Sequence, residues 1–206
     1  MRLLRGWGLS LVVGLGAGGG ALLLGTVLGL VASSAPKWVE EFILLLVQSL
    51  WVIPAVLWAT ALAFVLGKSF IGVVGAIILS TWTDTARLVR VESRRLWHMP
   101  YMDAARSLGL PFLSIVKRHL LPNLMPLLQT QFLQSFATAV FVEAGLGFVG
   151  LGLGPPYASL GALLFEALGW LTLPQGQLQG GLAALLLCGT VFASYWAIRM
   201  KRNSIE

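Results

Sequence analysis

The chain has 206 residues, of which 57% are hydrophobic and only 11% are charged. A soluble domain of this size cannot bury so much apolar surface, and average globular proteins carry about 25% charged residues. The composition therefore predicts an integral membrane protein. The net charge of +6 does not indicate a nucleic-acid partner, because the basic residues cluster between apolar stretches. The single cysteine, Cys188, excludes an internal disulfide framework and a cysteine zinc site.

Five stretches are apolar and long enough to cross a membrane, which takes about 20 residues. They cover residues 8–32, 42–66, 70–90, 124–146 and 178–198. The first of them is longer than the apolar core of a signal peptide, which has about 7–15 residues. The sequence therefore predicts an all-α, polytopic membrane helical bundle with about five transmembrane helices in one domain, residues 1–206.

The distribution of positive charge predicts the orientation of this bundle. With the N-terminus outside, the segments facing the cytoplasm are 33–41, 87–123 and 199–206, and they hold eleven of the fourteen Lys and Arg residues. Cytoplasmic loops are enriched in Lys and Arg. We therefore expect the N-terminus outside, the C-terminus in the cytoplasm, and a cytoplasmic loop over residues 91–123.

The first predicted span is rich in glycine, and several glycines lie four residues apart. Small residues at this spacing let membrane helices approach closely. The predicted packing pairs are Gly14/Gly18, Gly16/Gly20 and Gly25/Gly29.

The second predicted span contains Pro54 near its middle. A proline there kinks a helix and frees a backbone carbonyl, which membrane helices tolerate when neighbours or water satisfy it. Pro54 is therefore a candidate for the translocation pathway or a gate, with a purely structural bend as the alternative. The span ends at Gly67-Lys68-Ser69, but a phosphate-binding loop would need glycine where Leu62 stands, so we expect no ATP site in this chain.

Charged residues appear in the third span at Asp84 and Arg87. Residues three apart on a helix are neighbours, so we expect these two side chains to form an ion pair.

The central loop contains a short predicted helix. Pro100 suits its first turn, Gly109 suits a left-handed C-terminal cap, and Pro111 blocks its continuation. One helical face holds Tyr101, Ala104, Ala105 and Leu108, and the other holds Asp103, Arg106 and Ser107. A helix this short is marginal alone, so we expect it to dock against a partner, with the two alanines permitting close approach.

The fourth span is the most polar of the five. Polar side chains in a membrane helix face other helices or a wet cavity, which makes Gln131, Gln134 and Ser135 candidates for the translocation pathway. Glu143, near the outer end, is open to two interpretations: contact with a substrate, or reach to the membrane interface. The glycine-rich run 145–156 predicts irregular backbone, followed by a short helix over 159–168.

These residues resemble a known family. The spacing of Asp103, Ala104, Ala105, Gly109, Leu121 and Pro122 is similar to the EAA motif of the membrane subunits of binding-protein-dependent ABC importers. The flanking segments resemble the dipeptide, oligopeptide and nickel permeases: Trp82, Ala86, Arg87, Val89 and Arg90, then R-H-L-L-P-N at 118–123, then Glu143-Ala144 with the run to Pro156. The chain departs from the family's pattern in two places. Family permeases usually have an earlier span and an extracytoplasmic segment before this point, and the sequence leaves open a natural short form or an incomplete start. Leu160 stands where a tryptophan is usual.

The resemblance implies a permease subunit of a bacterial or archaeal inner-membrane importer. It implies two ATPase subunits, a second homologous permease and an extracytoplasmic solute-binding protein as partners. ATP and Mg would be bound by the ATPase subunits, and no cofactor by this chain. The helix at 101–109 would transmit ATPase closure as alternating access. The residues implied for ATPase coupling are Tyr101, Asp103, Ala104, Ala105, Arg106, Leu108 and Gly109.

The substrate stays open between peptides, our first expectation, and nickel or another metal chelate carried by the same machinery. A non-transporting membrane scaffold is the alternative from another class, and a membrane-embedded enzyme is the third. His98 and His119 have no cysteine or acid at metal-ligand spacing, so we expect neither a metal site nor catalytic residues.

Overall fold

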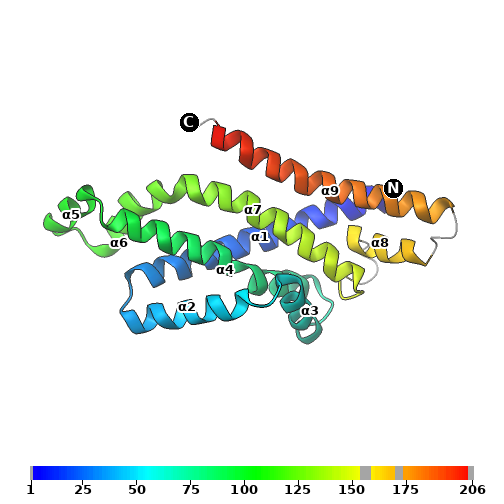
Figure 1. Ribbon diagram of the computed structural model, residues 1–206, viewed down its shortest axis with the longest axis horizontal. Helices are drawn as coiled ribbons and strands as arrows, with labels where there is room; N and C mark the ends of the chain where they lie inside the picture. The colour runs from blue at the N-terminus through cyan, green and yellow to red at the C-terminus, as the bar shows by residue number, and fades with distance from the viewer. Residues whose placement is uncertain (1, 154–158, 170–173, 204–206) are drawn as a thin grey trace.

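The computed structural model describes residues 2–153, 159–169 and 174–203, and every regular element within these ranges is helical. Four long helices run along the molecule (Figure 1): α1 (Arg2–Ser34), α4 (Phe70–Trp97), α7 (Leu121–Phe148) and α9 (Pro174–Asn203). The C-terminal part of α9 leans away from the other three. The predicted all-α class is therefore confirmed for the described residues.

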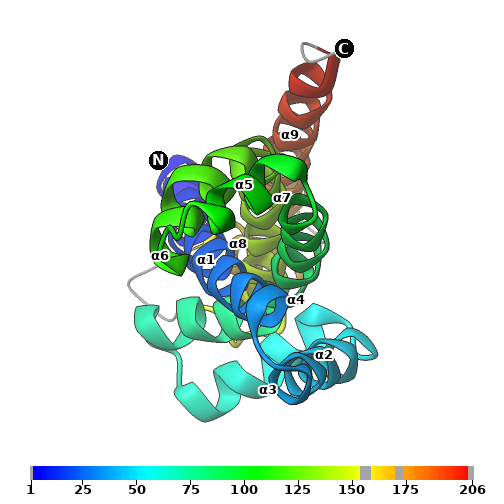
Figure 2. The ribbon, with the colours of Figure 1, turned by 90° about the vertical axis from the view of Figure 1, so that its left-hand side faces the viewer.

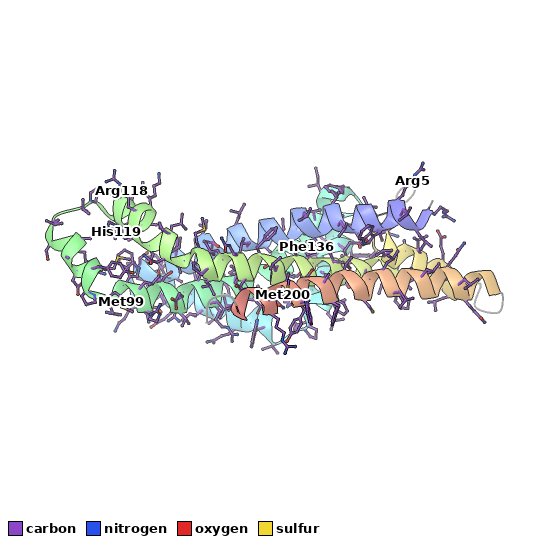
Figure 3. All side chains as sticks on the ribbon, turned by 90° about the horizontal axis from the view of Figure 1, so that it is seen from above. Arg5, Met99, Arg118, His119, Phe136 and Met200 are labelled. Atoms are coloured by element: carbon purple, nitrogen blue, oxygen red, sulfur yellow. The ribbon has the colours of Figure 1, made fainter. Side chains whose placement is uncertain are left out.

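Shorter helices occupy the two ends and one side. α5 (Pro100–Ser107), α6 (Phe112–Ile115) and the π-helix η1 (Val116–Leu120) form one end, and α8 (Leu160–Leu168) lies at the other. α2 (Lys37–Trp51) and α3 (Ala55–Leu66) lie on one side of the long helices, opposite α9 (Figure 2). Arg118 and His119 lie at the α5 end, whereas Arg5 lies at the α8 end (Figure 3).

Helix α1 packs through its glycines against α4 and α7. A Cβ atom on Gly18 would lie 2.8 Å from the backbone of Phe136, and one on Gly25 would lie 2.6 Å from the carbonyl oxygen of Trp82. Side chains at these positions would push the helices apart. The predicted close contacts are confirmed for Gly14, Gly18, Gly25 and Gly29.

The predicted Gly16/Gly20 pair is wrong in part. A Cβ on Gly16 would have nothing within 4 Å, and one on Gly20 would meet only the side chain of Ile78. Gly16 is turned away from α4 and α7, so its small size is not used for packing within this chain.

The predicted second span is broken instead of kinked. α2 ends at Trp51, α3 begins at Ala55, and the two axes differ by 97°. Proline has no N–H to continue the helical ladder and disfavours helical geometry at the preceding residue, Ile53. Pro54 accordingly has extended geometry (ψ 135°) and caps the start of α3.

Among the described helices, α1 and the Gly176–Met200 part of α9 are long and apolar enough to cross a membrane. The bent pair of α2 and α3 would make a third span if it counts as one. The predicted spans 70–90 and 124–146 lie within α4 and α7, whose polar residues make them less apolar than α1. The five-span topology stays a prediction.

The glycine-rich segment is more helical than the sequence predicts. α7 continues through Gly145 and Gly147 to Phe148, and the chain turns only at Gly150, where φ is +80°. α8 covers this end of α7 so closely that a Cβ on Gly147 would lie 2.8 Å from the nitrogen of Ala162. The short helix expected over 159–168 is confirmed as α8, and Pro155-Pro156 lie outside the described residues.

Candidate functional site

The local sequence determines where α5 starts and stops. Pro100 occupies its first turn, after Met99 in extended geometry. Gly109 has a φ of +70°, which L-residues with side chains rarely adopt. The N–H of Leu110 then donates to the carbonyl of Ala105 at 3.4 Å, which closes the C-terminal turn. The predicted start and end of this helix are confirmed.

One face of α5 is anchored within the chain. Met102 is fully buried and Ala105 is nearly so. They pack in an apolar cluster with residues from α4, α6, η1 and α7, namely Val89, Leu96, Trp97, Ile115, Leu120 and Leu124. Because Met102 and Ala105 lie three residues apart, this inward face is a single helical stripe. The fold therefore positions α5 mainly through Met102.

The opposite face of α5 is bare. Tyr101, Ala104 and Leu108 are exposed, and 79% of the Leu108 surface is accessible. We call these three residues the α5 outer face. The pattern of the sequence placed Ala105 on this face, which is wrong, because Ala105 is turned inward beside Met102. The α5 outer face is apolar and has no covering element among the described residues.

Trp97, at the end of α4, holds the polar side of α5. The guanidinium of Arg106 lies 5.0 Å from the centre of the Trp97 ring and donates to the Trp97 carbonyl at 3.0 Å. Phe112 stacks on the same ring, with 5.7 Å between the ring centres. Arg106 also pairs with Asp103 at 3.5 Å. Sequence reasoning missed Trp97 and Met102, although a large aromatic residue directly before the Pro100 helix start was a usable signal.

The segment after α5 contains a π-helix that the sequence did not predict. The N–H of Leu121 donates to the carbonyl of Val116, five residues back, and the side-chain amide of Asn123 donates to the His119 carbonyl at 2.6 Å. π-helical turns are rare and occur frequently at functional sites. Pro122 lies in the first turn of α7, and Pro126 lies inside the helix.

Glu40 ties α2 to α4 close to the α5 end. Its buried carboxylate accepts hydrogen bonds from Arg90 Nε at 2.9 Å and from Arg94 Nη2 at 2.5 Å. Removing one partner of a buried ion pair leaves an uncompensated charge, which costs about 3–5 kcal/mol. This cluster fixes the beginning of α2 and was not predicted.

The predicted pathway residues divide into two groups. Pro54 and Gln134 are exposed, whereas Gln131 and Ser135 are buried between helices. The hydroxyl of Ser135 lies 3.5 Å from that of Thr85 in α4. The structure does not bring the five predicted residues together into one cavity, since they are spread along α7 and the α2–α3 break.

Glu143 joins three helices in the interior. It is fully buried, and the Ser10 hydroxyl of α1 donates to its carboxylate at 2.8 Å. The same hydroxyl accepts from the N–H of Leu160, at the start of α8, at 3.3 Å. Neighbouring helices enclose the side chain, so Glu143 is not exposed at a membrane interface within this chain, and contact with a substrate stays a prediction.

The predicted ion pair in α4 is also wrong. Asp84 accepts a hydrogen bond from the indole nitrogen of Trp51 at 2.7 Å, and Arg87 lies 4.0 Å above the centre of the same indole ring.

No group of three or more His, Cys, Asp and Glu side chains that could hold a metal occurs in the described parts of the chain.

A comparison with known families identifies the class of protein. The family model for the binding-protein-dependent transport system inner membrane component matches residues 22–200. The chain belongs to this family of transporter membrane subunits.

Several relatives of the chain are named as permease proteins of transport systems. The chain is 32% identical over 166 residues to a glutathione transport system permease protein of Pectobacterium atrosepticum, covering 81% of this chain and 55% of the relative. It is 34% identical over 166 residues to a di/tripeptide transport system permease protein of Pseudomonas aeruginosa, with the same coverage. The chain thus spans about half the length of the curated relatives it matches.

A solved structure shares the whole fold. The match is to a chain of the inward-facing MetNI methionine ABC transporter, with a TM-score of 0.76 and 19% identity. The alignment covers 98% of this chain and 95% of that chain. At this identity the likeness establishes the fold alone.

Proposed function

We propose that the protein is a permease subunit of an ATP-driven ABC importer and forms half of a translocation pathway for peptides or a related small solute. The observation that carries the proposal is the division of α5 into an anchored inward face and a bare apolar outer face. A short helix that is fixed by its own chain and exposes tyrosine, alanine and leucine fits the cleft of a partner protein. Family membership supports an ATPase subunit as that partner.

The proposed mechanism is alternating access. Closure of two ATPase subunits on ATP and Mg, which those subunits bind, moves α5 as a rigid body. Met102 and Trp97 carry the movement into α4 and α7, because both side chains belong to the cluster that joins α5 to these helices. Coupling of this kind needs a packed element with two discrete positions.

The remaining assembly is proposed from the family and its relatives. A second homologous permease completes the pathway, and an extracytoplasmic solute-binding protein delivers the solute. The N-terminus lies outside and the C-terminus in the cytoplasm, which places the basic α5 end inside. The pathway residues proposed from sequence stay Pro54, Gln131, Gln134, Ser135 and Glu143. Of these, Glu143 is hydrogen-bonded to Ser10 of α1.

Affinity purification of the tagged protein in mild detergent, followed by mass spectrometry, tests the assembly. The proposal predicts an ATPase subunit and a second permease in a stable ratio, and ATP-dependent uptake of a dipeptide by the reconstituted complex. Recovery of the chain without an ATPase subunit would contradict it and favour a scaffold.

The coupling role has a separate test in Gly109→Val. A valine is strained at a φ of +70°, so the C-terminal turn of α5 would open. We expect normal membrane insertion with ATP hydrolysis uncoupled from uptake. Gly16→Val, at an open position, is the matched control. Normal uptake by Gly109→Val would refute the coupling role.

A further inference from the structure

Two opposite charges face outward on α4. Asp84 lies within the predicted span 70–90 and Arg87 lies toward its cytoplasmic end, and both are exposed. A charged side chain at membrane depth is costly, so such residues face a wet cavity, a subunit interface or a solute. Asp84 therefore marks a surface that lipid does not cover, and Arg87 extends that surface toward the cytoplasm.

The two charges are held apart. Glu92 and Arg95, at the same three-residue spacing in the same helix, form an ion pair, and so do Asp103 and Arg106 in α5. Asp84 and Arg87 do not, because Trp51 occupies both: its indole N–H donates to Asp84, and its ring lies under the Arg87 guanidinium. The neighbouring pairs show that helix geometry alone would have permitted an ion pair here.

Each charge consequently keeps free hydrogen-bonding capacity. The Oδ2 atom of Asp84 has no partner among the described residues, and the N–H groups of Arg87 donate to none of them. By contrast, the carboxylate of Glu40 is saturated by Arg90 and Arg94. The Trp51 arrangement leaves one anionic and one cationic group open on a single surface.

The same surface includes the break between α2 and α3. Trp51 is the last residue of α2, and the following Val52 and Ile53 are exposed, Val52 to 82%. The break lies near the middle of the long axis, where α2 stops (Figure 1). Non-helical backbone within a membrane is tolerated where it lines a cavity, and solute sites of transporters are built at discontinuous helices.

We propose that Trp51, Asp84 and Arg87 form a recognition site for the two charged ends of a short zwitterionic solute. The solute's ammonium group pairs with Asp84 and its carboxylate with Arg87, both through charge-assisted hydrogen bonds. Its apolar part lies against Val52 and Ile53. This inference rests on the proposed importer function and names residues that the pathway set of Pro54, Gln131, Gln134, Ser135 and Glu143 does not contain.

The spacing sets the size of solute that fits. Residues three apart on a helix have Cβ atoms about 5–6 Å apart. Consecutive Cα atoms of a peptide are about 3.8 Å apart. A molecule of one or two residues can therefore engage Asp84 and Arg87 together, whereas a longer peptide engages only one of them.

The test compares three solutes in proteoliposomes that contain the complete transporter and its solute-binding protein. The solutes are dialanine, N-acetyl-dialanine, which lacks the ammonium, and dialanine amide, which lacks the carboxylate. The variants are Asp84→Asn, which keeps an acceptor for Trp51, and Arg87→Gln. Glu92→Gln and Arg95→Gln, the paired residues of the same helix, are the matched controls.

We expect Asp84→Asn to raise the KM for dialanine at least tenfold and to leave the KM for N-acetyl-dialanine unchanged. Arg87→Gln is expected to do the same for dialanine while leaving the amide unchanged. Each variant thus stops distinguishing dialanine from the one analogue that lacks the corresponding charge. The control variants still distinguish dialanine from both analogues. The binding protein is the same throughout, so its own preference cancels from the comparison with wild type.

Three outcomes would overturn the inference. Unchanged discrimination in both variants would show that the solute does not touch these charges. An equal loss of uptake for all three solutes would place Asp84 and Arg87 at a subunit contact. Wild-type uptake of none of the solutes would contradict peptide import itself, which separates failure of the proposed function from failure of this site.

Discussion

Two short helices close the two ends of the bundle, and they are held very differently. α8 packs against the three long helices α1, α7 and α9, and buries Leu160, Leu163 and Ala167. α5 contacts mainly α4 and α6, and its fully buried side chain is Met102. α8 is thus a fixed part of the bundle. α5 instead projects from the bundle and is held mainly by one buried side chain, Met102. The difference supports the proposal that a partner protein covers α5.

The caps of the two helices show the same contrast. The Ser159 hydroxyl accepts from the N–H of Ala162 at 3.3 Å and so caps α8, and Arg2 pairs with Glu166 at 3.2 Å. α5 has no side-chain cap and starts instead at Pro100. A proline start and a left-handed glycine end give α5 a defined shape with few tertiary contacts. Such a helix can be moved by a partner without unfolding.

The anchor gives the largest predicted effect. Met102→Ala removes a fully buried side chain and leaves a cavity between α5 and α7, which costs about 2–5 kcal/mol. We expect a lower melting temperature in detergent and loss of ATPase-coupled uptake together. Met102→Leu, which conserves volume, should retain both. Full coupling in Met102→Ala would contradict the role of this anchor.

The second-largest expected effect is on the packing of α8 against α7. Gly161 faces the Ala144 carbonyl so closely that a methyl group has no room, so Gly161→Ala forces α8 away from α7. We expect a loss of about 1–3 kcal/mol of stability. The matched substitution Gly16→Ala, at a position with nothing within 4 Å, should leave the melting temperature unchanged or raise it slightly, because alanine is the better helix former. Equal melting temperatures for the two variants would show that the α7–α8 contact is loose.

The α5 outer face predicts an effect on association only. Leu108→Ala and Tyr101→Ala remove exposed apolar surface, so stability should stay within about 0.5 kcal/mol. Truncating one of the few side chains that dominate an interface costs more than about 1 kcal/mol. We therefore expect at least a fivefold weaker association with the ATPase subunit, measured by titration in nanodiscs. Phe165→Ala on α8 serves as the exposed control and should bind normally.

The smallest effect concerns acid sensitivity near the α5 end. Arg95 donates hydrogen bonds to Glu92 and holds the pKa of that carboxyl below its usual range. Because the folded pKa is lowered, the contribution to stability is present above the unfolded value, about 4.3, and is lost as pH falls through the folded value. Both side chains are partly exposed, so Glu92→Gln should lower the melting temperature by about 2 °C or less at pH 7. The difference from wild type should vanish in stronger acid.

Much of the fold could be predicted from local sequence. The bounds of α5 follow from Pro100 and Gly109, whose backbone preferences act within a few residues, and the close contacts of Gly18 and Gly25 follow from their spacing. α8 was also found, because an apolar segment follows a serine cap. These are features in which the chain determines its own geometry.

The parts that could not be predicted depend on contacts between distant residues. Trp51 separates Asp84 from Arg87 across 33 positions of the chain, and Ser10 reaches Glu143 across 133. Helical spacing alone favoured an Asp84–Arg87 pair, and nothing local to Asp84 indicates that an indole takes its place. The inward turn of Ala105 likewise depends on where η1 and α7 leave room for α5.

Cross-linking from Leu108 tests whether the α5 outer face docks on the ATPase subunit. Leu108 would be replaced by p-benzoylphenylalanine in the full transporter, with the same photoreactive residue at Phe165 of α8 as the control. Both positions are exposed, and they lie on helices at opposite ends of the bundle. Docking through α5 predicts an adduct with the ATPase subunit from position 108 and none from position 165. Adducts with the ATPase from position 165, or none from position 108, would contradict it.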